Sequence, residues 1–255
     1  MEIRILGCSG GPVEGGRTTS FLVNNSFLVD GGSGLGDLDA SVAARVRHVF
    51  VSHSHMDHVM GLPFLLEGML LKGEGQSLTV HASEATIAAL REHLFNNTLW
   101  PDMTRLPDEQ SPVLRFAPMQ PGQWVAMEGV EVAMVPVKHT VPTVGFILRD
   151  GQATVAFSGD TTSNNSLWEA LNRESRLDLL LVEAAYPDEL EWLCPLAGHY
   201  CPTLLAADLD KLKHQPRIGL SHFKPGLADT IIEQCRAAMP GRDLHPLSAG
   251  DVFRL

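Results

Sequence analysis

The stretch VFVSHSHMDHVMG, residues 49–61, places three histidines and one aspartate between positions 53 and 58, directly after an apolar run. Imidazole and carboxylate groups are the ligands that hold zinc, iron or manganese in proteins. His53 and His55 alternate, so both side chains point to one side of an extended chain, whereas Asp57 and His58 follow where the chain turns and can face a second metal. The order predicts half of a dinuclear metal site in a strand-to-helix loop. A surface loop with surplus histidines does not explain it.

The composition is that of a globular protein with enough apolar residues for a core. Of 255 residues, 44% are hydrophobic and 19% are charged, which predicts one α/β domain over residues 1–255. The net charge of −11 opposes a general affinity for nucleic acid. Four cysteines without a C-x-x-C pair argue against a thiolate zinc site or a disulfide framework. Because neither a signal sequence nor a membrane-spanning window is visible, a cytoplasmic location is expected, with no membrane partner.

Apolar runs and turn signals predict a similar pattern of elements in both halves of the chain. The first half is expected to contain strands at 2–7, 18–30, 46–52 and 78–81, with a hairpin turn at Asn24-Asn25 and helices at 59–69 and 85–94. The second half is expected to contain strands at 130–138, 144–149, 153–158, 177–183 and 217–222, with helices that start near 166, 202 and 227. Hairpins followed by alternating strands and helices, twice over, predict two mixed sheets packed face to face with helices outside. Between the halves periodicity fails, and a long loop on the side of the active site is expected at 96–122.

Further candidate ligands stand at the ends of other predicted strands. His139 follows VAMVPVK, Asp160 follows ATVAFSG and His222 follows RIGLS. A single histidine or aspartate of this kind is more often an ordinary hydrogen-bonded residue, but its placement at successive strand ends favours a shared site. A carboxylate at Asp160 can bridge two cations, because it has two oxygens and a negative charge.

With these seven positions filled, the sequence resembles the metallo-β-lactamase superfamily over nearly its whole length. The resemblance implies a four-layer αββα sandwich of two mixed β-sheets, with two divalent metal ions at their shared edge. It implies His53, His55 and His139 on one metal, Asp57, His58 and His222 on the other, and Asp160 between them. Zinc is the first expectation for these ions, with manganese and iron as alternatives.

A second constellation, LVEAAYPDELEWLCPLAGHYCPTLLAADL at 181–209, resembles a block in tRNA 3′-processing endonucleases and in class II cyclic-nucleotide phosphodiesterases. Glu183 ends a predicted strand and His199 precedes a predicted helix, so the carboxylate can orient the imidazole. An imidazole held in this way can act as a general acid or bind a phosphate oxygen. The alternatives are an ordinary loop carboxylate and a helix-capping histidine. Tyr200 stands where an apolar residue is usual in this block.

The two branches of phosphodiesterase differ in an RNA-binding arm between the third histidine and the bridging aspartate. Only residues 140–159 separate His139 from Asp160 here, which leaves no room for that arm. Stretches such as SHSHMDHVMGLPFLL, NNTLWPD, KHTVPTVGFIL and SHFKPG look closer to the cyclic-nucleotide enzymes. The resemblance therefore implies hydrolysis of 3′,5′-cyclic AMP, with cyclic GMP also open, to the 5′-nucleotide by a hydroxide between two metals. Catalytic roles are expected for Asp57, Glu183 and His199.

Other activities of the same superfamily are the alternatives. Processing of a precursor transfer RNA by a ribonuclease Z-like enzyme is the runner-up, and a thioesterase or lactamase is the next alternative. In a thioesterase or lactamase, Glu183 and His199 would have no evident purpose. A homodimer is expected from the resemblance alone.

Two residues are candidate substrate contacts. Trp100, in the 96–122 loop, could stack on a purine base or fill the edge of the core. Lys224, beside His222, could place a cation near the substrate or be an ordinary solvated lysine.

Overall fold

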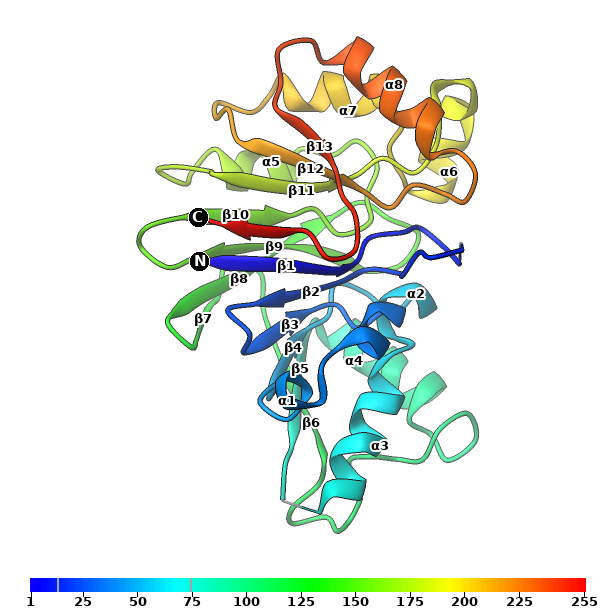
Figure 1. Cartoon of the computed structure of the whole chain (residues 1–255), viewed down its shortest axis with the longest axis vertical. Coiled ribbons are helices and arrows are strands. Elements are labelled where there is room, and N and C mark those ends of the chain that lie inside the picture. The colour runs from blue at the N-terminus through cyan, green and yellow to red at the C-terminus, as the bar shows by residue number, and fades with distance from the viewer. Residues whose placement is uncertain (13, 74) are drawn as a thin grey trace.

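Two mixed β-sheets lie face to face at the centre of the structure, with helices on their outer sides (Figure 1). The computed structural model describes residues 1–12, 14–73 and 75–255. The first sheet has the strand order β14 (Val252–Arg254), β1 (Glu2–Gly7), β2 (Ser20–Val23), β3 (Phe27–Val29), β4 (His48–Phe50), β5 (Leu78–Ala82) and β6 (Leu114–Pro118). The second has the order β13 (Leu244–Pro246), β12 (Arg217–Ser221), β11 (Leu179–Glu183), β10 (Thr154–Phe157), β9 (Thr143–Arg149), β8 (Val130–Val137) and β7 (Trp124–Met127). The αββα fold expected from the sequence is confirmed.

Each sheet joins an antiparallel part to a parallel part. In the first sheet β14, β1, β2 and β3 pair antiparallel, and β3 to β6 pair parallel. In the second sheet β7 to β10 pair antiparallel, and β10 to β13 pair parallel. Both halves of the chain therefore follow one plan, in which hairpins precede strand-helix units, as the sequence pattern predicts.

Alternate residues of the central strands face different apolar layers. In β11, Leu179 and Leu181 belong to the core between the two sheets, whereas Leu180 and Val182 pack under the helices of the second sheet. Because both faces of such a strand are buried, its sequence is an unbroken apolar run. A third layer lies between the first sheet and its helices, where Leu66 is fully buried.

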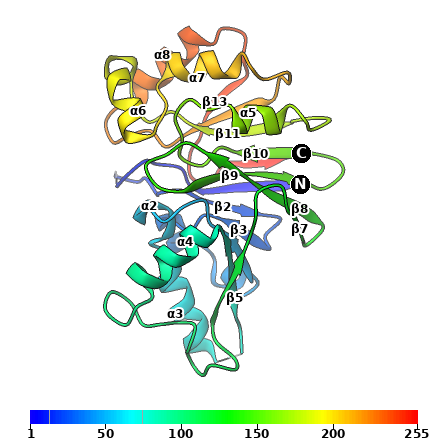
Figure 2. The ribbon, with the colours of Figure 1, turned by 180° about the vertical axis from the view of Figure 1, so that it is seen from behind.

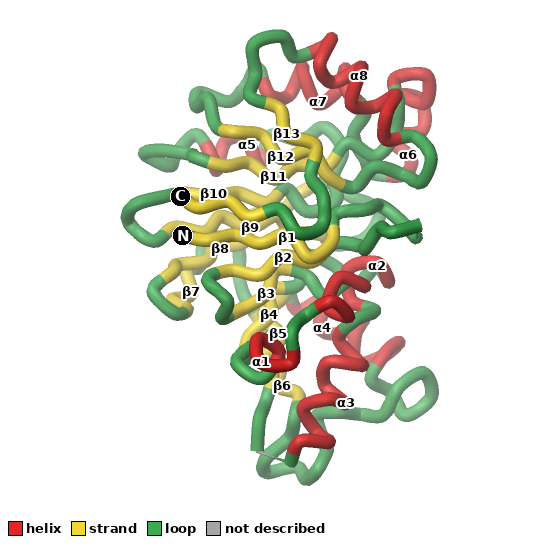
Figure 3. Tube along the Cα trace, viewed as in Figure 1, coloured by secondary structure: helices red, strands yellow, loops and turns green. Residues whose placement is uncertain are grey.

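The helices of each half cover their own sheet, with two short helices at one end of the sandwich (Figure 2). The first sheet is covered by α1 (Ala40–Ala43), α3 (Leu62–Lys72) and α4 (Glu84–Ala89), and the second by α5 (Ser166–Leu171), α7 (Pro202–Leu209) and α8 (Ala228–Ala238). The short helices at the end are α2 (Met56–Val59) and α6 (Cys194–Ala197), and three further short helical segments are η1 (Ser33–Asp37), η2 (Leu90–Leu94) and η3 (Asp188–Leu193). Figure 3 shows that loops connect these elements at the strand ends. Throughout the described ranges, every helix is too short or too polar to cross a membrane.

The sequence pattern misses β6, β7, β13 and β14, which are the four edge strands of the two sheets. An edge strand pairs on one side only, so its residues need not follow a clear apolar pattern. β6 lies inside the loop expected at 96–122, and that expectation is therefore wrong over Leu114–Pro118. The preceding residues 96–113, all of which the structure describes, form no helix or strand and lie beside α3 (Figure 1).

Two hairpin turns depend on residues with positive φ. Asn24 and Asn25 have φ values of 48° and 53°, which confirms the predicted turn between β2 and β3. Glu128 and Gly129, with φ values of 49° and 81°, connect β7 to β8 in a two-residue turn. Such turns match the twist of the flanking strands, and glycine and asparagine adopt them at low cost.

A histidine pair, in which His81 is buried and His48 is half-buried, gives the fold an expected acid sensitivity. His81 is stacked on Phe50 at a ring-centroid distance of 4.6 Å, and its Nε2 lies 3.0 Å from His48 Nδ1. Burial lowers the pKa of His81 from 6.5 to about 4, and His48 acts in the same direction. As the pH falls, His81 therefore binds a proton near pH 6.5 in the unfolded chain but only near pH 4 in the folded chain.

Stability should consequently fall as the pH drops from 6.5 toward 4, with a contribution from His81 on the order of 2 kcal/mol after allowance for solvent screening. His81→Gln keeps a polar partner for His48 but cannot titrate, so it should flatten this part of the pH dependence. Urea unfolding of both proteins at pH 7, 6, 5 and 4.5 measures the difference. Parallel curves for the two proteins would contradict the assignment.

Candidate active site

Strand ends from both sheets meet at one end of the sandwich. β8 and β10 both run antiparallel to β9, so they end at the same edge, and β11 and β12 run parallel to β10. The residues at or just after these ends are His139, Asp160, Glu183 and His222. In the first sheet β4 ends just before Ser52, whose carbonyl oxygen accepts a hydrogen bond of 3.1 Å from Val144 N of β9. This bond connects the loop that carries the histidine cluster to the end of the second sheet at which these strands meet.

The predicted ligands form two groups that share one carboxylate. The first group is His53, His55, His139 and Asp160, and the second is Asp57, His58, Asp160 and His222. Within each group the candidate ligand atoms lie within 4.8 Å of one another. Imidazole nitrogens and carboxylate oxygens in this number suit zinc, manganese or iron. The cluster is therefore suited to divalent metal ions, in the division that the sequence resemblance implies.

Asp30 orients His58, although the sequence pattern does not reveal this residue. Its Oδ2 accepts hydrogen bonds from His58 Nδ1 (2.7 Å) and Ser52 Oγ (2.8 Å), and its Oδ1 accepts one from Ser52 N (2.7 Å). Asp30 is fully buried with a φ of 57°, a backbone conformation that aspartate tolerates better than most residues. Burial raises the pKa of Asp30, against the effect of His58 and Ser52. With Nδ1 engaged in this way, Nε2 of His58 is the atom left for the cluster.

Two other imidazoles are held through Nδ1 as well. His53 Nδ1 lies 3.0 Å from Ser52 Oγ. Because the hydroxyl of Ser52 donates its proton to Asp30, its oxygen accepts the hydrogen bond from Nδ1–H of His53. His139 Nδ1 donates to the carbonyl oxygen of Gly198 at 2.7 Å, and its Nε2 lies 3.1 Å from His55 Nδ1. Gly198 has a φ of 71°, and a Cβ there would lie 2.7 Å from His139 Nδ1. Only glycine permits this approach.

Two ring nitrogens at the centre of the cluster make no hydrogen bond to the described residues, although Asp160 lies near both. Among the side chains that the structure describes, His53 Nε2 and His58 Nε2 are buried without a hydrogen bond. A buried polar atom left without a partner costs free energy, and a metal ion would provide that partner. Burial lowers the pKa of His53 and of His222 well below the usual value, which favours the neutral form that binds metals. The residues present therefore fit a metal centre.

Asp160 supplies negative charge at the middle of the cluster. Its Oδ2 lies 3.7 Å from His53 Nε2, 3.3 Å from His58 Nε2 and 3.2 Å from His222 Nε2. Burial opposes ionisation, but His222 and His58 hold the pKa of Asp160 well below its usual value. In turn, Asp160 and Asp30 outweigh burial and raise the pKa of His58. One carboxylate oxygen is thus within reach of both ligand groups, as a bridging ligand must be.

Glu183 and His199 lie together beside this cluster. His199 Nδ1 donates to Glu183 Oε1 at 2.7 Å, and the other carboxylate oxygen accepts a bond of 3.2 Å from Tyr200 N. The imidazole of His199 lies 4.9 Å from that of His139 and 5.1 Å from that of His222, measured between ring centroids. Burial lowers the pKa of His199, but the charge and hydrogen bond of Glu183 outweigh it, so the net change is upward. The pairing leaves Nε2 of His199 as the atom available to a substrate.

Asp208 holds the segment that carries His199 against the loop that follows Asp160. Its carboxylate accepts hydrogen bonds from Tyr200 Oη (2.6 Å), Trp168 Nε1 (2.9 Å) and Ser163 Oγ (2.8 Å). Tyr200 and Trp168 are almost completely buried. The hydroxyl of Tyr200 has a specific partner, which accounts for a tyrosine at a position where an apolar residue is usual.

Asp208→Ala should lower the free energy of unfolding by about 3 kcal/mol, because it leaves the donors of Tyr200 and Trp168 buried without an acceptor. Asp210→Ala is the matched control, since Asp210 is an exposed acid on the same segment and its loss should change stability by less than about 0.5 kcal/mol. Urea unfolding with the same excess of chelator in each sample measures both. Equal values for the two variants would contradict the structural role of Asp208.

Lys224 and Trp100, the predicted substrate contacts, lie in different surroundings. Lys224 Nζ donates to the carbonyl oxygen of Gly10 at 3.0 Å and lies 3.2 Å from His222 Nε2, directly beside the ligand cluster. Trp100 instead packs on Phe64 of α3, at a ring-centroid distance of 5.2 Å, and against the core of the first half. This location agrees with the alternative that Trp100 fills a core edge, and its contact with a substrate stays a prediction.

Comparison with known proteins places these features in a family. A family model described as β-lactamase superfamily domain matches residues 25–241. A probable 3′,5′-cyclic-nucleotide phosphodiesterase of Yersinia pestis is 28% identical, over 88% of this chain and 78% of that protein. A 3′,5′-cyclic-nucleotide phosphodiesterase of Aliivibrio fischeri is 24% identical, over 88% of this chain and 82% of that protein. A ribonuclease Z of Methanococcus maripaludis is 28% identical, but only over 41% of this chain and 32% of that protein.

Solved structures show the same fold at low sequence identity. The metallo-β-lactamase fold protein YhfI of Bacillus subtilis has a TM-score of 0.80 and 21% identity, with 99% of each chain covered. Unliganded yeast PDE1 has a TM-score of 0.79 and 21% identity, with 95% of each chain covered. The arrangement of strands and helices is therefore shared across nearly the whole chain.

Proposed function

The chain belongs to the β-lactamase superfamily, and we propose that it is a dinuclear metal-dependent phosphodiesterase that hydrolyses 3′,5′-cyclic nucleotides to 5′-nucleotides. The observation that carries the proposal is the Glu183–His199 pair beside two ligand groups that share Asp160. The ligand groups supply a site for metal-assisted hydrolysis, and the pair adds a proton donor that phosphodiester cleavage can use. The names of the Yersinia pestis and Aliivibrio fischeri relatives support the same substrate class.

The ligand groups would hold the two ions, with His53, His55 and His139 on one side, Asp57, His58 and His222 on the other, and Asp160 between them. Two divalent ions supply Lewis acidity toward the phosphate oxygens and lower the pKa of water. Zinc is the first candidate, and manganese and iron suit the same donors. Asp30, Ser52 and the Gly198 carbonyl fix the rings of these ligands, so little reorganisation is needed when ions bind.

His199 is proposed to protonate the departing O3′ atom. Glu183 accepts the Nδ1 proton, which fixes the imidazole and stabilises its cationic form, so the proton on Nε2 can be given to the substrate. Asp57 belongs to the second ligand group, is a quarter exposed at its side chain and lines a groove, so the phosphate would enter beside it. The ammonium group of Lys224 lies on the same side and can neutralise phosphate charge.

Ribonuclease Z-like processing of precursor transfer RNA is the second candidate, because a ribonuclease Z of Methanococcus maripaludis matches part of this chain. Between His139 and Asp160 the structure contains only the β9–β10 hairpin and its flanking residues. That segment offers no arm to grip RNA, and the net charge of −11 does not favour a polyanion. The expected homodimer and cytoplasmic location belong to the proposal as predictions.

Incubation of the metal-loaded protein with 3′,5′-cyclic AMP, 3′,5′-cyclic GMP and a 3′-extended precursor transfer RNA separates the candidates. Chromatography should show metal-dependent formation of a 5′-nucleotide, and the transfer RNA should keep its 3′ extension. Removal of the extension without turnover of either cyclic nucleotide would overturn the proposal in favour of the ribonuclease.

A further inference from the structure

A groove opens beside the second ligand group. Its volume is about 720 Å³, and its lining includes Asp57 and Lys224, which lie at the ligand cluster, together with Met56, Met60, Arg17 and Ser33. This size suits a small-molecule ligand such as a nucleotide. Because Asp57 belongs to the ligand cluster, a phosphate at the cluster would leave the rest of the molecule in this groove.

Met56 and Met60 form an apolar platform along one wall of the groove. Met56 is 52% exposed and Met60 is 37% exposed, so both thioethers are accessible from the groove that they line. Met60 N donates to the carbonyl oxygen of Met56 at 2.9 Å, so the two residues stand one helical turn apart on the same face. Their side chains are therefore about 5–6 Å apart at Cβ, a spacing that matches the length of a bicyclic base better than that of a single ring.

Polar residues that are held in place also line the groove. Arg17 makes a paired contact with Asp37, through Nε to Oδ2 at 2.8 Å and Nη2 to Oδ1 at 3.3 Å. The hydroxyl of Thr18 lies 4.0 Å from the sulfur of Met60. The groove thus offers soft, polarizable thioethers together with fixed polar groups, as a pocket for a heteroaromatic ring requires.

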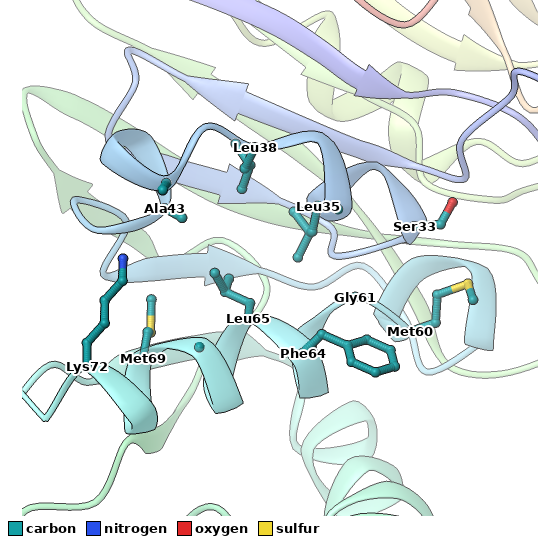
Figure 4. A pocket seen from close by; sticks show the side chains of 13 residues that line it. Ser33, Leu35, Leu38, Ala43, Met60, Gly61, Phe64, Leu65, Met69 and Lys72 are labelled. Atoms are coloured by element: carbon teal, nitrogen blue, oxygen red, sulfur yellow. The ribbon is translucent and has the colours of Figure 1, made fainter.

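Met60 also separates this groove from a neighbouring cavity. Figure 4 shows the second cavity, of about 430 Å³, with Met60 and Phe64 on the helical side and Ser33 and Leu35 on the facing segment. Met60 and Ser33 line both spaces. Phe64, which carries the contact with Trp100, lines only the second cavity. The platform beside the ligand cluster is therefore built from the methionines, whereas Trp100 contacts Phe64, a residue of the second cavity.

We propose that Met56 and Met60 bind the purine base of the substrate, with the base stacked on the two thioethers and the phosphate at the Asp57 end of the groove. This assignment rests on the proposed function, since it presupposes a nucleotide substrate. Thioether groups attract aromatic rings through polarizability and contact area, without selecting one purine over the other. Cyclic AMP and cyclic GMP should accordingly use the same platform.

Methyl NMR of the metal-loaded protein tests the contact directly. The chain has nine methionines, which can be labelled with ¹³C at the methyl group, and Met56→Leu and Met60→Leu assign the two signals. The product 5′-AMP should shift these two signals upfield by ring currents. Ribose 5-phosphate, which has the sugar and phosphate but no base, should leave them in place.

Kinetics provide the second arm. Met56→Ala combined with Met60→Ala should raise KM for cyclic AMP about tenfold, because two ring contacts are lost. Turnover of the 3′,5′-cyclic phosphate of methyl riboside, which has the sugar and phosphate but no aromatic ring, should change less than about twofold. Leu71→Ala is the control, since Leu71 is 80% exposed on α3 and lines neither cavity.

The outcomes distinguish this assignment from the proposed function. Hydrolysis of cyclic AMP by the unaltered protein, without shifts at Met56 and Met60 and with an unchanged KM in the double variant, would overturn the assignment alone. Failure of the unaltered, metal-loaded protein to hydrolyse any cyclic nucleotide would overturn the proposed function and this assignment with it.

Discussion

Replacement of Asp160 by alanine should lower kcat/KM for a cyclic nucleotide by roughly 10⁴-fold or more and reduce the bound metal below two ions per chain. The reason is the position of this carboxylate, whose Oδ2 lies within 3.7 Å of ring nitrogens from His53, His58 and His222. Without it, the two ligand groups would bring two cations together with one negative charge fewer between them. No other carboxylate belongs to both groups among the residues that the structure describes.

Metal analysis by mass spectrometry and steady-state kinetics on the same samples measure both effects. Asp160→Asn tests whether charge or shape is lost, because it keeps the side-chain volume but removes the negative charge. Asp210→Ala, at an exposed position, controls for a general effect of losing an acid. Two ions per chain with full activity in Asp160→Ala would contradict a bridging role.

Replacement of His199 by alanine should slow hydrolysis of a cyclic nucleotide by about 10²-fold to 10³-fold while both metal ions stay bound. His199 lies beside His139 and His222 but belongs to neither ligand group. If it protonates O3′, its loss matters most when the leaving group is a poor one. A p-nitrophenyl ester of a nucleotide has a leaving group that needs no protonation, and its hydrolysis should fall by less than about fivefold.

The comparison of the two substrates separates an acid from a structural residue. An equal loss on both would reassign His199 to phosphate binding, and full activity on both would reassign it to structure. Glu183→Gln should share the pattern of His199→Ala in weaker form, since the amide can still accept the Nδ1 proton but cannot stabilise a cationic ring. His93→Ala is the control, because that histidine is exposed and remote in sequence from every candidate metal ligand and from Glu183 and His199.

Much of the site could be predicted because metal chemistry requires specific residue types at positions that strand order fixes. His139, Asp160 and His222 follow three alternate strands of one sheet, and they reach the same end of that sheet because β8, β10 and β12 run in one direction. The spacing within residues 53–58 likewise follows from one turn of backbone. Chemistry of this kind leaves a signature in a single sequence.

Asp30 could not be predicted in the same way. It orients His58 from 28 positions earlier in the chain, and only the fold brings the two side chains to 2.7 Å. The four edge strands were missed for a different reason. Each pairs on one side, so burial imposes a weak pattern on it, as β6 with its terminal Pro118 illustrates.

The platform of Met56 and Met60 shows a third kind of difficulty. Both methionines are visible within the histidine motif, but an apolar residue there is ordinarily assigned to the core. Their exposure, and the groove that they line, appear only in three dimensions. The sequence predicts base stacking at Trp100 rather than at the methionines, because an aromatic side chain is the more common stacking partner of a base.

The most direct test is a metal titration of chelator-stripped protein, with conversion of 3′,5′-cyclic AMP to 5′-AMP followed by chromatography. No turnover is expected without added metal, and the rate should reach a plateau at two equivalents of zinc or manganese per chain. Turnover by the stripped protein at the rate of the loaded one, or no conversion at any metal loading, would contradict a dinuclear cyclic-nucleotide phosphodiesterase.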